Sequence, residues 1–236
     1  MIFRGWQKNS LIEWPDKIST VVFVGGCTFA CPWCHNRDLV FSPEKFEAID
    51  GQTVLDYLAE NRKFLDGVMI SGGEPLAGLE VKSKADDFLG FVEKIKELGL
   101  GVGIETNGSN PDFLEYLLKN DLIDYVAMDI KAPLVPEKYK TLSGVDVDLE
   151  KIKKSIELIK NLALDYEFRT TVVPGMLTEK DLIDVAEAIK GAKRFYLQEF
   201  KPELVPHWPH KPFLRQVSAR LKEKLKDYFE IFDIRL

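Results

Sequence analysis

Hydrophobic runs of strand length alternate along the chain with segments whose hydrophobic residues recur at helical spacing. The first run, Ser19–Val24, is almost entirely β-branched or aromatic, which predicts a strand buried on both faces. Further runs predict strands over residues 67–70, 101–104, 125–128, 166–173 and 194–197, with a last one over 229–234. Hydrophobic residues three or four positions apart predict the intervening helices, near residues 54–58, 86–98, 113–118, 149–159, 182–189 and 214–225.

Strict alternation of strands and helices predicts a parallel sheet with right-handed crossovers. A closed barrel of eight strand–helix units takes about 250 residues. Six units in 236 residues therefore predict an α/β fold of the open, partial (βα)6 TIM-like barrel type. We expect one domain over residues 1–236, with a lead-in over 1–18, a proline-rich rim loop over 200–212 and a C-terminal helix and strand over 213–236.

Composition narrows the classes of function. The net charge of −6, without a block of basic residues, disfavours a nucleic-acid partner. No apolar run reaches the length that spans a bilayer and no signal peptide is visible, so we expect no membrane partner and a cytoplasmic, reducing location. The chain has three cysteines, all between positions 27 and 34, which predicts a metal site rather than a disulfide framework.

The cysteines follow the first predicted strand as Cys27-x3-Cys31-x2-Cys34, at the sheet edge where barrel enzymes build active sites. Three interpretations compete. The first is a 4Fe–4S cluster with three protein ligands and one open iron, since closed clusters use four cysteines. The second is a zinc site completed by His35, whose position next to Cys34 turns its side chain away from a shared ion. The third is three buried apolar cysteines. The spacing and the preceding glycine pair favour the open cluster.

Residues 71–75, Ser-Gly-Gly-Glu-Pro, follow the second predicted strand. The glycines Gly72 and Gly73 let a ligand approach the backbone, and the Glu74 carboxylate can pair with an ammonium group. The alternative is a plain glycine turn before a helix.

Charged and amide side chains follow the next strands. Glu105 and Asn107 end the third strand, and Asp129 and Lys131 end the fourth, so we expect them at the mouth of the barrel. Helix capping or turn formation is their alternative role. Arg169 lies inside the otherwise apolar fifth strand and needs a carboxylate partner, supplied either by a ligand or by a strand-end Glu or Asp.

Residues 27–36, CTFACPWCHN, resemble the cluster loop of radical S-adenosylmethionine (SAM) enzymes. Trp33 and the His35-Asn36 pair resemble, more narrowly, activating enzymes of glycyl-radical proteins. The lead-in (GWQK at 5–8, LIEWPDK at 11–17) is similar to the start of short, barrel-only activating proteins of anaerobic ribonucleoside-triphosphate reductases. The resemblance extends from residue 5 to about residue 200.

This resemblance implies two cofactors, a 4Fe–4S cluster on the three cysteines and SAM. It also implies a set of cofactor-binding residues around SAM: Gly72, Gly73 and Glu74 at the amino group, Glu105, Asn107, Asp129, Lys131 and Arg169 near the ribose and carboxylate, and Trp33 and His35 in the cluster loop. Trp33 would supply an apolar face for adenine or, alternatively, cap the barrel core. Glu105 stands where the family often has Asp, which leaves a monovalent cation there undecided.

The implied reaction is reductive cleavage of SAM at the cluster, giving a 5′-deoxyadenosyl radical that makes a glycyl radical on a partner enzyme. The partner would be of the anaerobic ribonucleotide reductase or pyruvate formate-lyase type. Without cysteines for further clusters, we expect an external one-electron donor of the flavodoxin or ferredoxin type. The alternatives are a small-molecule enzyme resembling 7-carboxy-7-deazaguanine synthase and a non-catalytic iron–sulfur carrier or zinc module. We expect His207 and His210 in the rim loop, without a metal.

Overall fold

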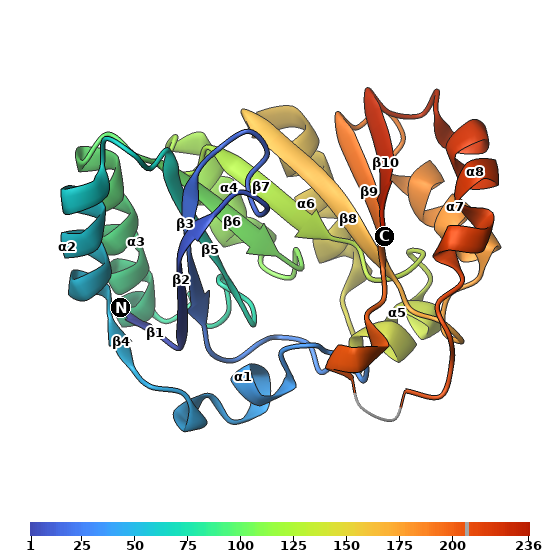
Figure 1. Ribbon diagram of the computed structural model, residues 1–236, viewed down its shortest axis with the longest axis horizontal. Coiled ribbons are helices and arrows are strands. Elements are labelled where there is room, and N and C mark those ends of the chain that lie inside the picture. Colours follow the sequence, from blue (N-terminus) through green and yellow to red (C-terminus); the bar gives the residue numbers. More distant parts are fainter. Residues whose placement is uncertain (206–207) are drawn as a thin grey trace.

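A single curved sheet forms the centre of the protein (Figure 1). The computed structural model describes residues 1–205 and 208–236. In this part of the chain the sheet has eight strands in the order β2-β3-β5-β6-β7-β8-β9-β10. The strands are β2 (Gly5–Ser10), β3 (Ser19–Val24), β5 (Gly67–Gly72), β6 (Gly101–Thr106), β7 (Tyr125–Asp129), β8 (Asp165–Val172), β9 (Arg194–Glu199) and β10 (Ile231–Arg235). Neighbours from β3 to β10 are parallel, and β2 pairs antiparallel with β3.

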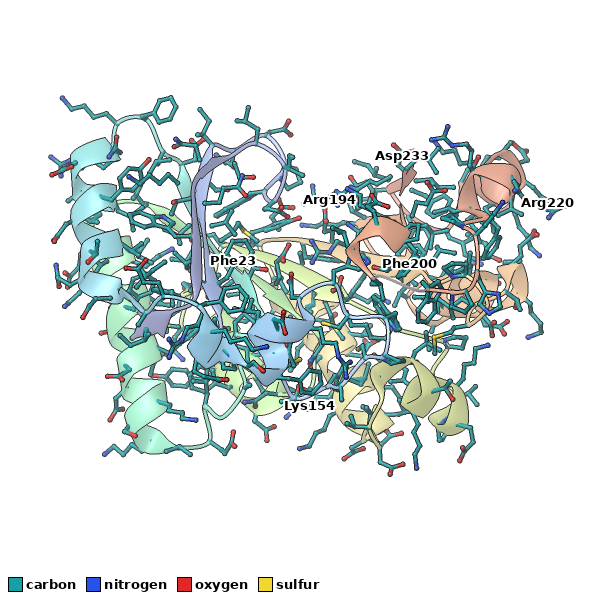
Figure 2. All side chains as sticks on the ribbon, turned by 60° about the horizontal axis from the view of Figure 1, so that its bottom comes forward. Phe23, Lys154, Arg194, Phe200, Arg220 and Asp233 are labelled. Carbon is teal, nitrogen blue, oxygen red and sulfur yellow. The ribbon has the colours of Figure 1, made fainter. Side chains whose placement is uncertain are left out.

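Helices connect consecutive parallel strands. They are α2 (Gly51–Asn61), α3 (Lys82–Glu97), α4 (Pro111–Lys119), α6 (Leu149–Leu162), α7 (Glu179–Ala188) and α8 (Leu214–Leu225). Charged side chains such as Lys154 and Arg220 project outward from them, whereas their apolar faces are buried (Figure 2). The described chain also contains the short helices α1 (Arg37–Phe41) and α5 (Pro136–Ser143), the 3-10 turns η1 (Pro43–Lys45) and η2 (Pro202–Leu204), and the paired strands β1 (Ile2–Phe3) and β4 (Ile49–Asp50).

The predicted fold class is confirmed, because six parallel strands each lead into a crossover and the described edge strands, β2 and β10, stay unpaired with each other. A capping box formed by Thr178 and Asp181 starts α7. Several short or peripheral elements escaped prediction, and the reason is clearest for two of them. Strand β2 has no apolar alternation, because Gln7, Lys8 and Asn9 are all exposed at the sheet edge. Helix α5 buries little beyond Tyr139 and Leu142, too few to set a helical period.

A small apolar cluster closes the barrel interior at the amino ends of the strands. Trp14 from the lead-in stacks on Tyr125 of β7, with ring centroids 5.4 Å apart. Glycines make room for the indole, because a Cβ on Gly67 or Gly101 would lie 2.8 Å from it. With this end filled, the carboxyl ends of the strands remain as the place for a site.

Candidate active site

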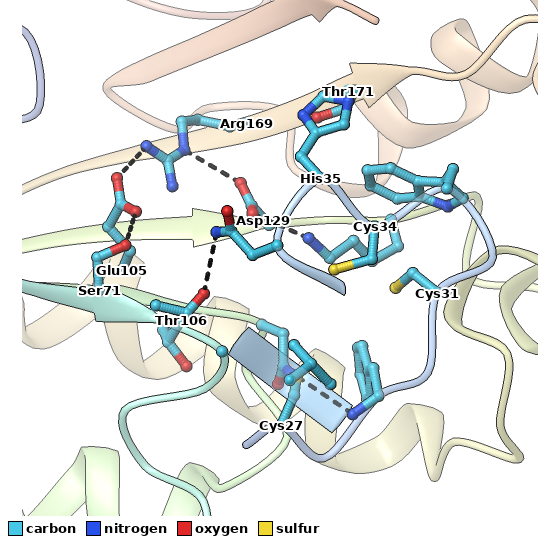
Figure 3. A pocket seen from close by; sticks show the side chains of 18 of the residues that line it. Cys27, Cys31, Cys34, His35, Ser71, Glu105, Thr106, Asp129, Arg169 and Thr171 are labelled. Carbon is cyan, nitrogen blue, oxygen red and sulfur yellow. Dashed lines mark hydrogen bonds and ion pairs between the residues drawn. The ribbon is translucent and has the colours of Figure 1, made fainter. Parts of the chain in front are cut away.

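A cavity of about 290 Å³ lies at the carboxyl ends of the parallel strands (Figure 3). Its wall includes twelve of the thirteen residues predicted from the sequence. These are Cys27, Cys31, Trp33, Cys34, His35, Gly72, Gly73, Glu105, Asn107, Asp129, Lys131 and Arg169. The structure therefore brings together residues from the cysteine loop (residues 25–36) and from strands β5 to β8, which lie up to 142 positions apart in the chain (169 − 27 = 142).

The three cysteines of the loop all line the cavity. The backbone N–H of Cys34 donates to the Cys31 carbonyl over 3.1 Å, which makes the Cys31-Pro-Trp-Cys34 segment a tight turn. The Cys27 sulfur accepts hydrogen bonds from the Phe29 backbone N–H (3.3 Å) and the Asn107 side-chain amide (3.7 Å). Burial raises the pKa of the Cys27 thiol, and it raises the pKa of Cys31 to about 11. Metal coordination would reverse this preference for the neutral thiol, since a bound cation deprotonates its thiol ligand.

Backbone hydrogen bonds fix the start of the cysteine loop against the glycine motif after β5. The N–H of Gly73 donates to the Val24 carbonyl (3.0 Å), and that of Glu74 donates to the Gly26 carbonyl (2.9 Å). A Cβ on Gly73 would lie only 1.7 Å from the Gly26 oxygen. Gly73 is therefore required by this backbone contact, a role that the sequence analysis did not assign to it.

Glu74 is the predicted residue that does not line the cavity. Its buried carboxylate accepts hydrogen bonds from Thr106 Oγ1 (2.7 Å), the Asn107 N–H (2.7 Å) and the Leu76 N–H (3.1 Å). Burial raises the pKa of Glu74 to about 7 in spite of these three donors. The carboxylate thus fixes the turn after β6, and the contact of Glu74 with a ligand amino group stays a prediction.

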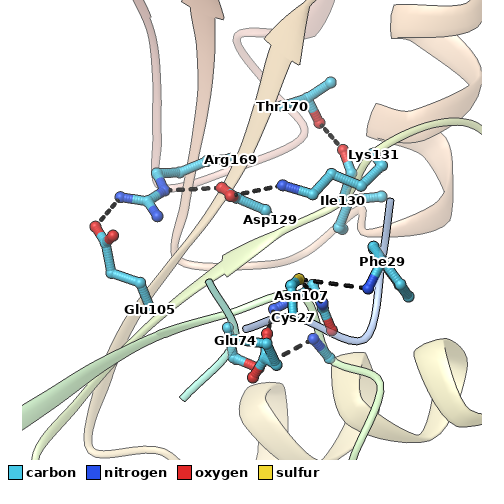
Figure 4. A network of polar contacts seen from close by, with 12 residues as sticks. Cys27, Phe29, Glu74, Glu105, Asn107, Asp129, Ile130, Lys131, Arg169 and Thr170 are labelled. Atoms are coloured by element: carbon cyan, nitrogen blue, oxygen red, sulfur yellow. Dashed lines mark hydrogen bonds and ion pairs between the residues drawn. The ribbon is translucent and has the colours of Figure 1, made fainter. Parts of the chain in front are cut away.

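Charged side chains from three adjacent strands form a connected network in the cavity (Figure 4). Arg169 donates to Glu105 over 2.6 Å and to Asp129 over 3.0 Å, and Lys131 donates to Asp129 over 2.9 Å. Burial opposes ionisation of Asp129, but Lys131 and Arg169 outweigh it and lower its pKa to about 2. Of the two partners expected for Arg169, the structure shows the strand-end carboxylates. The two cations and the two carboxylates of this network make the cavity strongly polar.

Aromatic residues close the cavity around the cysteine loop. The Trp33 indole N–H donates to the Leu142 carbonyl (2.8 Å), and the Lys131 ammonium lies 5.2 Å from the centre of its ring. The His35 ring packs 5.3 Å from Phe200, and burial, aided by Lys131 and Lys201, lowers its pKa. His35 is therefore a neutral, packed ring at the edge of the cavity.

The zinc alternative does not fit this geometry. A zinc site holds all its nitrogen and sulfur ligands about 2.0–2.3 Å from one ion. Among residues 1–205 and 208–236, no three His, Cys, Asp or Glu side chains are close enough together to share an ion. No preformed single-ion site in the described residues therefore supports the zinc alternative. His207 lies outside the described residues, and the His210 ring packs on Gly175.

Further cavity residues were not among the thirteen predicted site residues. They are Glu13, Phe29, Asn36, Val40, Phe41, Ser71, Thr106, Thr171 and Gln198. Thr171 lies two positions after Arg169 on β8 and pairs in register with Gln198 on β9, so the twofold periodicity of a strand was the signal for it. Glu13 comes from the lead-in, where burial and the nearby Glu105 raise its pKa to about 7.

Comparison with known proteins identifies the family. Residues 21–189 match the model of the radical SAM superfamily. A Methanocaldococcus jannaschii protein named as a glycyl-radical enzyme activating enzyme is 36% identical over 82% of this chain and 78% of its own length. The pyruvate formate-lyase-activating enzyme of Clostridium pasteurianum is 27% identical over 85% of this chain and 79% of its own. The chain belongs to the radical SAM superfamily, and within it to the group of glycyl-radical enzyme activating enzymes.

Two further similarities bear on fold and function. The crystal structure of Streptococcus suis SuiB bound to its precursor peptide SuiA superposes with a TM-score of 0.67 at 17% identity, covering 92% of this chain but 48% of SuiB. This chain thus spans about half of SuiB, and the likeness concerns the fold. The 7-carboxy-7-deazaguanine synthase of Thermococcus kodakarensis is 23% identical over 94% of this chain and 91% of its own. None of the helices in the described residues is long and apolar enough to cross a bilayer.

Proposed function

We propose that this enzyme binds a 4Fe–4S cluster through Cys27, Cys31 and Cys34, binds SAM beside it, and makes a glycyl radical on a partner enzyme. The observation that carries the proposal is that three thiols, glycine backbone and a charged network line one cavity. When bound, the reduced cluster supplies the electron that cleaves SAM, and this cleavage supplies the radical that takes the glycine hydrogen.

The cavity wall offers a partner for each polar group of SAM. The backbone of Gly72 and Gly73 faces the cavity and can accept hydrogen bonds from the amino group, while Lys131 is the cation beside the cysteine loop and suits the carboxylate. Asp129 and Glu105 can accept hydrogen bonds from the ribose hydroxyls. Held in this way, SAM and the cluster react within one complex instead of by collision.

The partner and the electron donor are further parts of the proposal. The substrate is a loop of a glycyl-radical enzyme of the ribonucleotide reductase or pyruvate formate-lyase type, as the names of the relatives suggest. Electrons come from an external donor of the flavodoxin or ferredoxin type. A reducing compartment such as the cytoplasm would keep the three thiols free for iron.

The test is anaerobic incubation of the iron-loaded enzyme with a candidate partner, SAM and dithionite, followed by EPR of the partner. A glycine-centred radical signal is expected only when all components are present. A Cys31→Ala variant should give none. If SAM is cleaved but no glycyl-radical partner tested acquires the signal, the activase function is overturned while SAM chemistry stands.

A second candidate function follows from the near full-length similarity to a 7-carboxy-7-deazaguanine synthase. Such an enzyme would bind a pterin-like substrate in the cavity. A large rise in melting temperature with a carboxylated pterin, and none with a glycine-containing partner peptide, would favour this alternative.

A further inference from the structure

The end of helix α5 lies directly against the middle of the cysteine loop. The backbone N–H of Ala30 donates to the Ser143 carbonyl, and the indole N–H of Trp33 donates to the Leu142 carbonyl, both over 2.8 Å. These two hydrogen bonds flank Cys31 in the sequence. They use carbonyl groups at the carboxyl end of α5, which have no partner within the helix itself.

Gly144 ends this helix in the left-handed conformation, with φ of 73°. A Cβ at this position would lie 2.1 Å from the Ala30 carbonyl oxygen and 2.6 Å from its carbon. Both sides of the contact are backbone, so no flexible side chain can move aside. Any residue with a Cβ would therefore have to push the cysteine loop away from α5.

We propose that Gly144 is a positioning residue for the cluster: its lack of a side chain lets α5 hold Cys31 where three thiolates can bind one cluster. The inference rests on the proposed function, since it assumes a cluster on the three cysteines. Cys27 is held separately, because its end of the loop is bonded to the glycine motif after β5 and to Asn107. Displacing Ala30 would thus move Cys31 relative to Cys27, and the turn from Cys31 would carry Cys34 with it.

Two other glycines provide matched controls. Gly99 and Gly191 also follow helices with positive φ, 76° and 82°, but a Cβ at either would meet nothing within 4 Å. Substituting alanine at any of the three positions imposes the same left-handed strain. Only Gly144→Ala adds a collision with the cysteine loop, so the difference between the variants isolates the position of that loop.

The experiment compares Gly144→Ala with Gly99→Ala and Gly191→Ala after anaerobic reconstitution with iron and sulfide. We expect all three variants to keep the native circular dichroism spectrum. Gly144→Ala should lose iron to a chelator roughly tenfold faster than wild type, as for other residues that orient metal ligands. It should also change the EPR spectrum of the reduced cluster, while both controls match wild type.

A second variant keeps the inference testable if Gly144→Ala does not fold. Trp33→Phe retains an aromatic ring but removes the hydrogen bond to Leu142, and it should also speed iron loss. If Gly144→Ala retains iron as long as wild type does and has the same EPR spectrum, the inference is overturned. If Gly144→Ala does not fold, the same result for Trp33→Phe overturns it. Equal iron loss in the glycine controls would also overturn it. Failure of wild type to bind four irons would instead overturn the proposed function, so the two failures are distinguishable.

Discussion

Arg169 shows how a single residue organises the cavity. It is 6% exposed and bridges carboxylates from β6 and β7, so one cation serves two strand ends. Burial disfavours its charge, but Glu105 and Asp129 outweigh burial and raise the pKa of Arg169. Arg169 therefore stays positively charged, and it holds Glu105 and Asp129 in the wall of the cavity, where a ligand can contact them.

Replacing Arg169 with glutamine should therefore destabilise the protein. The substitution leaves Glu105 without its cation, whereas Asp129 keeps Lys131, and breaking a buried ion pair typically costs about 3–5 kcal/mol of unfolding free energy. Urea denaturation followed by circular dichroism measures this cost. Arg220→Gln removes an exposed ion pair with Glu179 and serves as the control, with little change expected. Equal effects of the two substitutions would contradict this account of the network.

Most residues that line the cavity could be predicted from their type and their position after a strand. The places of Glu74 and Glu13 could not, because they depend on the folded geometry. Cysteines, glycines and charged residues at the ends of predicted parallel strands had to meet at one sheet edge. The direction of Glu74 was not predictable, because it depends on the N–H groups that the turn after β6 presents. Glu13 has no strand-end context in the sequence, and only the folded lead-in brings it to the cavity.

Among the elements, the lead-in has a role that its sequence did not reveal. We predicted no strand in residues 1–18, yet β2 adds an edge strand and Trp14 fills the barrel interior. The parallel strands could be predicted from the sequence, because strands buried on both faces appear as continuous hydrophobic runs. Strand β2 and helix α5 bury few side chains, so their sequences carry weak periodicity.

Trp14→Ala tests this role of the lead-in. Truncating a buried tryptophan opens a cavity beside Tyr125 and should cost about 3–5 kcal/mol of unfolding free energy. Trp14→Phe keeps part of the packing and should cost less. Urea denaturation of both variants provides the measurement, and a cost below about 1 kcal/mol for Trp14→Ala would show that the lead-in does not support the barrel.

At the scale of the whole molecule, the cavity acids give stability a dependence on pH. Glu13 has a pKa of about 7 in the folded protein, above its ordinary value of 4.5, because burial and Glu105 disfavour its charge. The folded state therefore keeps this proton up to a higher pH than the unfolded state does. As a result, the free energy of unfolding falls as pH rises from about 4.5 to 7. Above that range the penalty is constant.

Glu13→Gln removes this penalty. The melting temperature of the variant relative to wild type should increase from pH 5 to pH 7 and then level off. The difference in melting temperature between the two proteins reports on Glu13 alone. Glu74, whose pKa is also raised to about 7, contributes equally to both proteins and cancels. A difference that stays constant between pH 5 and pH 8 would contradict the buried, proton-holding carboxyl described here.

We propose that three cysteines hold a cluster with one iron open to SAM, and EPR of the reduced, anaerobically reconstituted protein is the decisive experiment. We expect about four irons per chain, as a 4Fe–4S cluster requires, and a cluster signal whose shape changes when SAM is added. Replacing any one of Cys27, Cys31 and Cys34 with alanine should abolish that signal. A protein that binds no iron would show that the cysteines hold no cluster, and a cluster signal indifferent to SAM would show that no iron is open to it.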